Sequence, residues 1–357
     1  MHLATIIKRA SWIIMIILLA GCFQGEQTLE EMDMPQIDYS EQESAAKRVQ
    51  GEEDEPEEEP EASSVFRELF LLDANGMVAP QSIEMPLLPS YEVATQALEY
   101  LVRGGPITPS LPNGFQAVLP EGTEVLGMDL QKDGTLVVDF SEEFKEYAEQ
   151  EELKILQAMT YTLTQFENVE RIKLHIAGEP ISEMPVAGTP ISQGYSRANG
   201  INLLNNDITD FLQSETETIY YPAQYQDQDY YIPVTQYMEK NDEDKIETIV
   251  NSLLGGTSLL FTTNIVHVFH PDAGLAEPPT IEDGVVTLHF NEMILEDVDQ
   301  QIISDEVVET LVRTLTEQPT IEAVQIKVSN MDSLKRENGE SYDEPVTKES
   351  FSTKDKL

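Results

Sequence analysis

Apolar and polar positions between residues 65 and 187 follow two different periods, which predicts strands and helices in one stretch. Residues 66–72 and 77–85 alternate apolar with polar side chains, as strands with one buried face do. Residues 93–102 carry apolar side chains three or four positions apart, which indicates a helix. The helix is expected to end at Gly104-Gly105, because glycine tolerates the backbone conformation that closes a helix.

The second half of this stretch predicts a hairpin, a helix and a last strand. Residues 123–140 are expected to form two strands joined at Asp133-Gly134, a pair typical of tight hairpin turns. Ser141 is placed to cap a helix that follows the hairpin. Residues 171–176 alternate cleanly as a closing strand. The predicted buried stripe of the helix is Leu153, Leu156, Met159, Leu163 and Phe166.

The same order of elements recurs about 150 residues later. Offsets that drift by only one or two residues across several landmarks indicate a tandem duplication. The shared positions are turn glycines and apolar core positions, so the duplication preserved a shape. The matched segments are Gly104-Gly105 with Gly255-Gly256, Asp133-Gly134 with Asp283-Gly284, and Thr162–Gln165 with Thr314–Glu317.

The predicted fold class is α+β, with two tandem copies of a small two-layer α/β sandwich. Each copy has the order β-β-α-β-β-α-β, with two helices packed on one face of a sheet. We expect the first domain at residues 65–187 and the second at residues 216–332. Residues 188–215 would connect them as a linker, and residues 333–357 would form a frayed polar tail.

The N-terminus predicts export and lipid anchoring. Residues 1–21 begin with a short basic region and continue with an apolar run too short to span a bilayer, as in a secretory signal peptide. Leu19-Ala20-Gly21-Cys22 resembles a bacterial lipobox, in which the cysteine sulfur takes the lipid and small residues precede the cut. Two acyl chains on Cys22 would suffice for stable anchoring to the outer face of the cell membrane.

Charge and cysteine content narrow the function classes. Residues 22–64 are rich in acids and poor in apolar side chains, so we expect a lipid-anchored disordered stalk. The formal net charge of −45 repels nucleic acid, which we exclude as a partner. Cys22 is the only cysteine, so disulfide frameworks within the chain, cysteine metal sites and thiol catalysis are also excluded. The acidity itself could reflect a salty or alkaline habitat as well as function.

Together, the lipobox, the acidic stalk and the duplicated units resemble the GerM family of sporulation and germination lipoproteins. The most distinctive segments are residues 97–106, 111–120 and 184–192, and the second copy departs more from this pattern. The resemblance implies GerMN domains that are similar to the ring-building motifs of secretion systems. It further implies a non-catalytic scaffold that faces the space between mother cell and forespore and helps to assemble the channel complex there. Protein partners or self-association, and an indirect effect on germination, would follow.

Candidate chemistry is sparse, so no enzyme, cofactor or metal is predicted. His267 and His270 could in principle bind zinc, but His267 lies in the alternating stretch of residues 265–269, which predicts a strand position, and no HExxH helix accompanies the pair. A cell-wall hydrolase with paired carboxylates and a solute-binding lipoprotein stay as alternatives. Part of one tyrosine cluster could be an exposed partner surface, although strand positions explain most of it. Its members are Tyr220, Tyr221, Tyr225, Tyr230 and Tyr231.

Overall fold

The computed structural model describes residues 64–88, 90–204, 214–240, 244–257 and 263–351. All of these ranges fall in one compact unit of the chain. Among them, no helix has both the length and the apolar character that a membrane crossing requires. The predicted signal peptide and lipobox lie outside the described residues, as does the predicted stalk except Ser64, with which the first strand begins.

The first copy contains every element that the pattern predicts, in the predicted order. Short additional strands and 3₁₀ helices lie between and after these elements. The main elements are β1 (Ser64–Leu72), β2 (Val78–Pro86), α2 (Ser90–Tyr100), β3 (Val125–Leu130), β4 (Thr135–Phe140), α3 (Glu152–Leu163) and β5 (Arg171–Ile176). The additional ones are η1 (Thr108–Ser110), η2 (Glu142–Lys145), η3 (Glu149–Glu151), β6 (Glu179–Pro180), β7 (Tyr195–Ser196) and η4 (Arg197–Asn199).

The second copy repeats this order, which confirms the α+β class and the duplication. Its hairpin strands are longer than those of the first copy. The elements are β8 (Ser214–Tyr225), β9 (Gln228–Glu239), α4 (Lys245–Gly255), β10 (Leu275–Glu282), β11 (Val285–Phe290), η7 (Glu292–Ile294), α5 (Asp305–Leu315), β12 (Ala323–Val328) and η8 (Lys348–Phe351).

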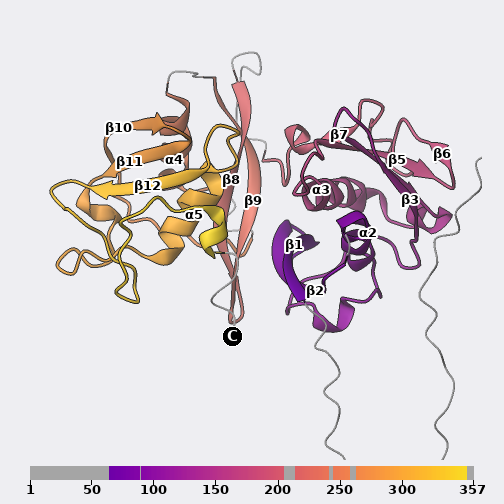
Figure 1. Cartoon of the computed structure of the whole chain (residues 1–357), viewed down its shortest axis with the longest axis horizontal. Helices are drawn as coiled ribbons and strands as arrows, with labels where there is room; N and C mark the ends of the chain where they lie inside the picture. Colours follow the sequence, from indigo (N-terminus) through magenta and orange to yellow (C-terminus); the bar gives the residue numbers. More distant parts are fainter. Residues whose placement is uncertain (1–63, 89, 205–213, 241–243, 258–262, 352–357) are drawn as a thin grey trace, which may run out of the picture. The chain divides into compact units, whose positions relative to one another are not determined.

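Strands of each copy are divided between two sheets. The first two strands form an antiparallel hairpin of their own, β1–β2 or β8–β9. The next three form a mixed sheet, in which β3 and β10 run antiparallel to their neighbours and the following pair is parallel. In the first copy, β6 and β7 also join this sheet by pairing with β5. The second helix, α3 or α5, contacts both the hairpin and the mixed sheet of its copy (Figure 1). The hairpin therefore closes the side of the helices that the sheet leaves open.

This double cover changes the predicted stripe of the second helix. Every residue from Ile155 to Leu163 is buried, because α3 packs against elements on two sides. Leu153, predicted to be buried, is 49% exposed, and Phe166 is only partly buried beyond the helix end. Ser141 precedes the 3₁₀ helix η2, so the prediction that it caps the long helix is wrong.

The segments that follow the last strand of each copy are parts of the repeat. Tyr195 in β7 pairs with Ile172 of β5, and Val346 pairs in the same way with Val324 of β12. Tyr342 is 9% exposed, so the described part of the C-terminal segment is packed and the prediction of a frayed tail is wrong. Two of its few apolar side chains, Leu334 and Tyr342, are buried among polar ones, and so few apolar positions leave no clear period in the sequence.

Candidate interaction surfaces

The predicted lipidation site lies outside the described residues, so Cys22 with Leu19, Ala20 and Gly21 stays a prediction. The predicted turn residues are all described. Gly134 and Gly284 have positive φ angles of 78° and 80°. A carbonyl oxygen at each of them accepts hydrogen bonds from the start of the closing strand, at Glu170 and Glu322. The two hairpin turns differ in length and in conformation. In the second, Asp283 also has a positive φ of 48°, whereas in the first, Asp133 accepts a hydrogen bond from the amide of Thr135.

The glycine pairs at the first helix of each copy are not equivalent residue by residue. Gly104 has a positive φ of 73°, whereas in the second copy it is Gly256, with a φ of 74°, that closes the helix. A Cβ on Gly105 would come within 2.9 Å of two backbone carbonyl oxygens, but one on Gly255 would meet nothing within 4 Å. The helix end therefore needs one left-handed glycine in each copy, and the second glycine is required by space only at Gly105.

The tyrosine cluster joins the two copies and is mostly buried. Tyr220, Tyr221 and Tyr230 are at most 4% exposed. The Tyr230 hydroxyl donates to the Asp73 carboxylate at 2.9 Å, and its ring meets that of Phe115 edge-on at 4.9 Å between centroids. These contacts cross from the second hairpin to the first copy. The hypothesis that the cluster offers an exposed partner surface is therefore not favoured for these three side chains.

One ion cluster at this junction is centred on Glu68 of β1. Arg313 of α5 donates to one of its oxygens at 3.0 Å, and Lys348 of η8 donates to the other at 2.9 Å. Burial alone would raise the pKa of Glu68, but the charges and hydrogen bonds of Lys348 and Arg313 outweigh it and lower the pKa to about 2. The Arg313 guanidinium also lies 4.9 Å from the centre of the Tyr231 ring.

In a second ion cluster at the junction, the cation comes from the first copy and the carboxylate from the second. Arg197 of η4, at the end of the first copy, donates to both oxygens of Glu317 at 3.0 and 2.9 Å. The Tyr220 hydroxyl donates to the same carboxylate at 2.9 Å. Arg197 and Lys348 occupy equivalent places, since each lies in the 3₁₀ helix that ends its copy. Each copy thus extends one cation to a carboxylate of the other.

Thr162 and Thr314, matched by the duplication, show how the copies reuse one internal contact. Both side chains are fully buried in the second helix of their copy. The Thr162 hydroxyl accepts a hydrogen bond from the backbone amide of Phe70 at 3.0 Å, and that of Thr314 accepts one from Tyr220 at 3.1 Å. A buried hydroxyl at this position satisfies an amide of the hairpin strand, which ties the hairpin to the helix in both copies.

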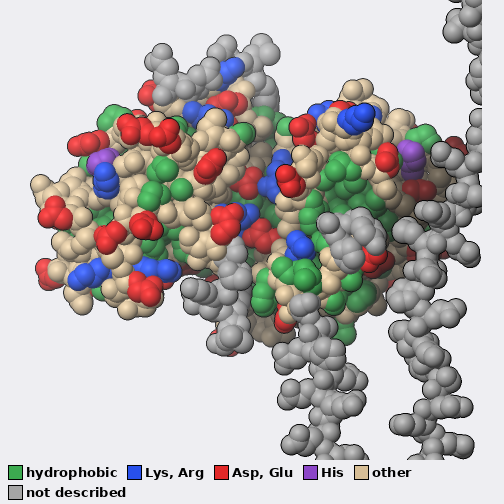
Figure 2. Space-filling view, in the orientation of Figure 1, with side chains coloured by type: hydrophobic (Ala, Val, Ile, Leu, Met, Phe, Trp, Pro, Cys, Tyr) green, Lys and Arg blue, Asp and Glu red, His purple; other side chains and the backbone are tan. Residues whose placement is uncertain are grey.

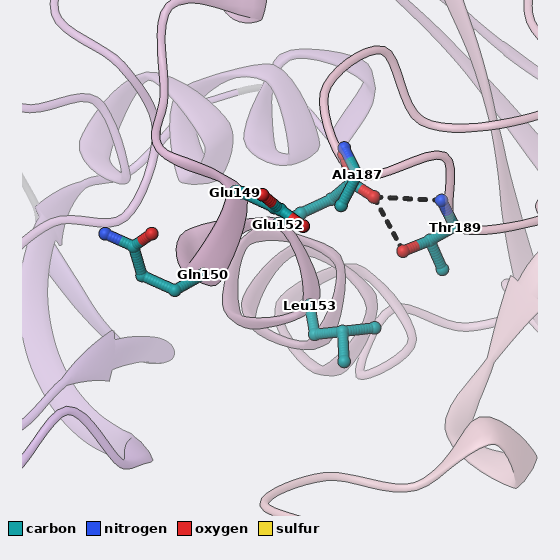
Figure 3. A pocket seen from close by; sticks show the side chains of 6 residues that line it. All are labelled: Glu149, Gln150, Glu152, Leu153, Ala187 and Thr189. Atoms are coloured by element: carbon teal, nitrogen blue, oxygen red, sulfur yellow. Dashed lines mark hydrogen bonds between the residues drawn. The ribbon is translucent and has the colours of Figure 1, made fainter.

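A surface hollow of about 320 Å³ lies at the N-terminus of α3, beside the buried carboxylate of Glu152 (Figure 3). That carboxylate accepts hydrogen bonds from the amides of Val186, Ala187 and Thr189 at 3.1, 2.6 and 2.9 Å. The hydroxyls of Thr189 and Tyr147 donate to it as well, at 2.6 and 2.9 Å. Burial would raise the pKa of Glu152, but these donors outweigh it and lower the pKa. A carboxylate held by five donors fastens a loop and is poorly suited to accept a proton.

The candidate metal ligands are not brought together. Over the described ranges, no group of three His, Asp or Glu side chains could hold a metal ion. His267 and His270 lie in a loop, so the prediction that His267 sits in a strand is wrong. The His270 Nδ1 accepts the amide of Asp272 at 3.1 Å.

Comparisons with known proteins support one family for both copies. The model of the Germane family, described as sporulation and spore germination, matches residues 68–182 and 218–332. The chain belongs to the Germane family. It is 42% identical over 347 residues to the spore germination protein GerM of Bacillus subtilis (strain 168), covering 94% of this chain and 93% of that protein.

A solved structure of the tandem GerMN domains of the sporulation protein GerM from Bacillus subtilis has the same fold. It is 45% identical to this chain, with a TM-score of 0.72, and the match covers 80% of this chain and 97% of that one. The resemblance to the GerM family is therefore confirmed. These comparisons indicate no catalytic family for the chain.

The Germane matches end at residues 182 and 332, before the segments that carry Arg197 and Lys348. The domain boundaries predicted from the sequence, at residues 187 and 332, also leave both cations outside the two domains. One signal was available, since Tyr195 and Val346 stand at nearly the same offset as the matched strands. Glu68 and Glu152 gave no comparable signal among so many acids.

Proposed function

We propose that this Germane-family chain is a non-catalytic scaffold lipoprotein, tethered through Cys22 to the extracytoplasmic face of the cell membrane. The observation that carries the proposal is the use of its buried polar groups. Glu68, Arg197 and Glu317 lock the copies together, and Glu152 fastens a loop. Because these buried polar side chains stabilise the fold, we infer that the protein acts through its surface.

Exposed apolar side chains indicate which part of the surface binds a partner. Most of the large apolar side chains that are exposed belong to the first copy, which shows broader hydrophobic patches than the second in the view of Figure 2. Exposed apolar patches on a folded surface are typical of protein-binding sites. The members of this set in the first copy are Phe66, Leu87, Leu126, Leu130, Leu153 and Val186.

We infer that the protein acts in sporulation, in the assembly of the channel complex between mother cell and forespore, and influences germination indirectly. Its relatives are named a spore germination protein and a sporulation protein. A lipid anchor and the acidic segment after it would place the two copies outside the membrane, where such a complex is built. No feature of the described residues favours a wall hydrolase or a solute-binding protein over this scaffold.

Fractionation and imaging of sporulating cells test the anchor and the place of action. Wild type is compared with Cys22→Ala, which removes the sulfur that takes the lipid, and with Phe23→Ala, which keeps it. We expect wild type and Phe23→Ala at the membranes around the forespore and Cys22→Ala to be lost from the membrane fraction. Crosslinked partners from these membranes should include channel components. An even distribution over vegetative cells without such partners would refute the assembly role.

A further inference from the structure

In the mixed sheet of the first copy, the outer side of one edge strand pairs with no other strand among the described residues. β3 pairs with β4 alone, whereas the opposite edge, β5, is covered by β6 and β7. An uncovered edge presents backbone N–H and C=O groups to which another strand can add.

The pairing pattern shows which groups of β3 point away from the sheet. The amide of Gln131 donates to the Thr135 carbonyl, so Gln131 turns its N–H group toward β4. Antiparallel ladders alternate such residues with residues whose N–H and C=O groups point outward. In the register of Met128 with Val138 and Leu130 with Leu136, the outward groups are therefore those of Met128 and Leu130.

The equivalent edge in the second copy is blocked. β10 contains Pro278-Pro279, and its register with β11 shifts on either side of Glu277. Proline has no N–H, and irregular pairing prevents another strand from lying alongside. At an offset of 151 residues, Pro279 stands where Met128 stands in β3. The duplication thus left one protected edge and one accessible edge.

Apolar side chains accompany the accessible edge. Leu126 is 52% exposed and Leu130 is 46% exposed. Met128 is only half-buried, and its sulfur lies 3.3 Å from the Thr95 hydroxyl of α2, so the helix borders the strand on one side. A strand added to β3 would cover these apolar groups as well as the free backbone groups.

Acidic side chains surround the same edge. Glu92 and Glu99 lie three residues before and four residues after Thr95, so they share its face of α2. Both are exposed, as are Glu124 and Asp129 on or beside the strand. A segment that binds here must bring positive charge, and a second copy of a chain with net charge −45 would be repelled.

We propose that β3 is a docking edge for an extended segment of a partner protein in which basic and apolar residues alternate. The segment adds a strand beside β3, bonds to the backbone groups of Met128 and Leu130, and places its cations against the acids of α2. This inference rests on the proposed assembly role, because it names the way in which a partner is bound.

The test uses the full chain in mild detergent and a blocked ten-residue peptide of alternating valine and lysine. A peptide of alternating valine and glutamate controls for charge. We expect the basic peptide to bind, the acidic one not to bind, and the Met128 and Leu130 amides to become protected from hydrogen exchange. Leu130→Pro removes one outward N–H without breaking the ladder to β4, and should weaken binding about tenfold, as the loss of one hydrogen bond does.

Ile281→Pro is the matched control, because Ile281 holds the equivalent exposed position on the blocked edge, at 47% exposed. It should leave binding unchanged. Absence of peptide binding, equal effects of both prolines, or binding without amide protection would each overturn the docking edge. If the full chain self-associates and Leu130→Pro abolishes this self-association, the proposal is overturned too, because the edge would then bind another molecule of the same protein.

Crosslinking in sporulating cells distinguishes the proposed assembly role from the proposed docking at β3. Should Leu130→Pro keep the crosslinks to channel components while Cys22→Ala loses them, the scaffold stands and the β3 edge fails. If wild type itself makes no such crosslinks, the assembly role fails whatever the peptide does.

Discussion

In both copies a carboxylate opens the second helix, yet the two carboxylates hold different partners. Glu152 begins α3 and binds backbone amides of the loop at residues 186–189. Asp305 begins α5 and binds the Arg336 guanidinium at two atoms, both at 3.1 Å, and the Tyr342 hydroxyl. In each case the carboxylate fastens the segment that follows the last strand. The position and its task were preserved, while the side chains that perform the task changed.

The difference explains why the family match to the second copy ends at residue 332, before the closing segment. Its closing segment is held by side chains such as Arg336 and Tyr342, which look like ordinary surface residues of a polar stretch. The first copy uses backbone amides for the same contact, and its loop carries the distinctive segment at residues 184–192. Equivalent structure in the two copies is therefore hidden from a residue-by-residue match.

Removal of the C-terminal segment gives the largest expected effect and tests this equivalence. A chain that ends at Asp332 loses Leu334 and Tyr342, both buried, and the Lys348 bond to Glu68. At ~1.5–3 kcal/mol for each buried apolar side chain, we expect the free energy of unfolding to fall by roughly 5 kcal/mol. Urea denaturation followed by circular dichroism measures it.

A chain that ends at Phe351 is the control, since it removes only residues beyond the described range. It should unfold at the same urea concentration as the full chain. If the chain that ends at Asp332 also does, the segment is a tail and not the end of the repeat.

The helix-opening carboxylates give the next largest effect when they are changed to amides. Glu152→Gln sets an NH₂ group against donors of a fully buried site, and should cost about 3 kcal/mol. Asp305→Asn should cost about 1 kcal/mol, because that side chain is 33% exposed and water can replace lost contacts. Thermal and urea unfolding of both variants measure the difference. Equal costs would mean that the two sites are energetically alike despite their different partners.

A structural feature can be predicted from this sequence when it produces a periodic pattern of apolar and polar residues. The strands, the helices and the duplication follow from alternation and from landmarks such as Asp133-Gly134 and Asp283-Gly284. Ion pairs between distant segments leave no period, and among 66 acids in the chain nothing marked Glu68 or Glu152. Leu153 has the apolar spacing of the buried stripe, but it lies in the first turn of α3 beside the surface hollow and is therefore exposed.

The ion cluster at Glu68 gives a smaller effect than the loss of the C-terminal segment, and this effect depends on pH. The duplication sets Thr218 where the first copy has Glu68, at an offset of 150 residues, so only the first copy has a titratable group here. The pKa of Glu68 is lowered from 4.5 to about 2 in the folded protein. Its contribution is therefore complete above about pH 5 and is lost as the pH falls toward 2.

Glu68→Gln should lower the free energy of unfolding by about 2–3 kcal/mol at pH 7. The gap between wild type and variant should close as the pH falls from 5 to 2, because a protonated Glu68 no longer attracts Arg313 and Lys348. Thr218→Ala, the change at the equivalent position, should shift stability by the same amount at every pH. Urea unfolding at a series of pH values decides between them. A gap for Glu68→Gln that is constant from pH 7 to pH 2 would show that the junction is held by shape and not by this charge.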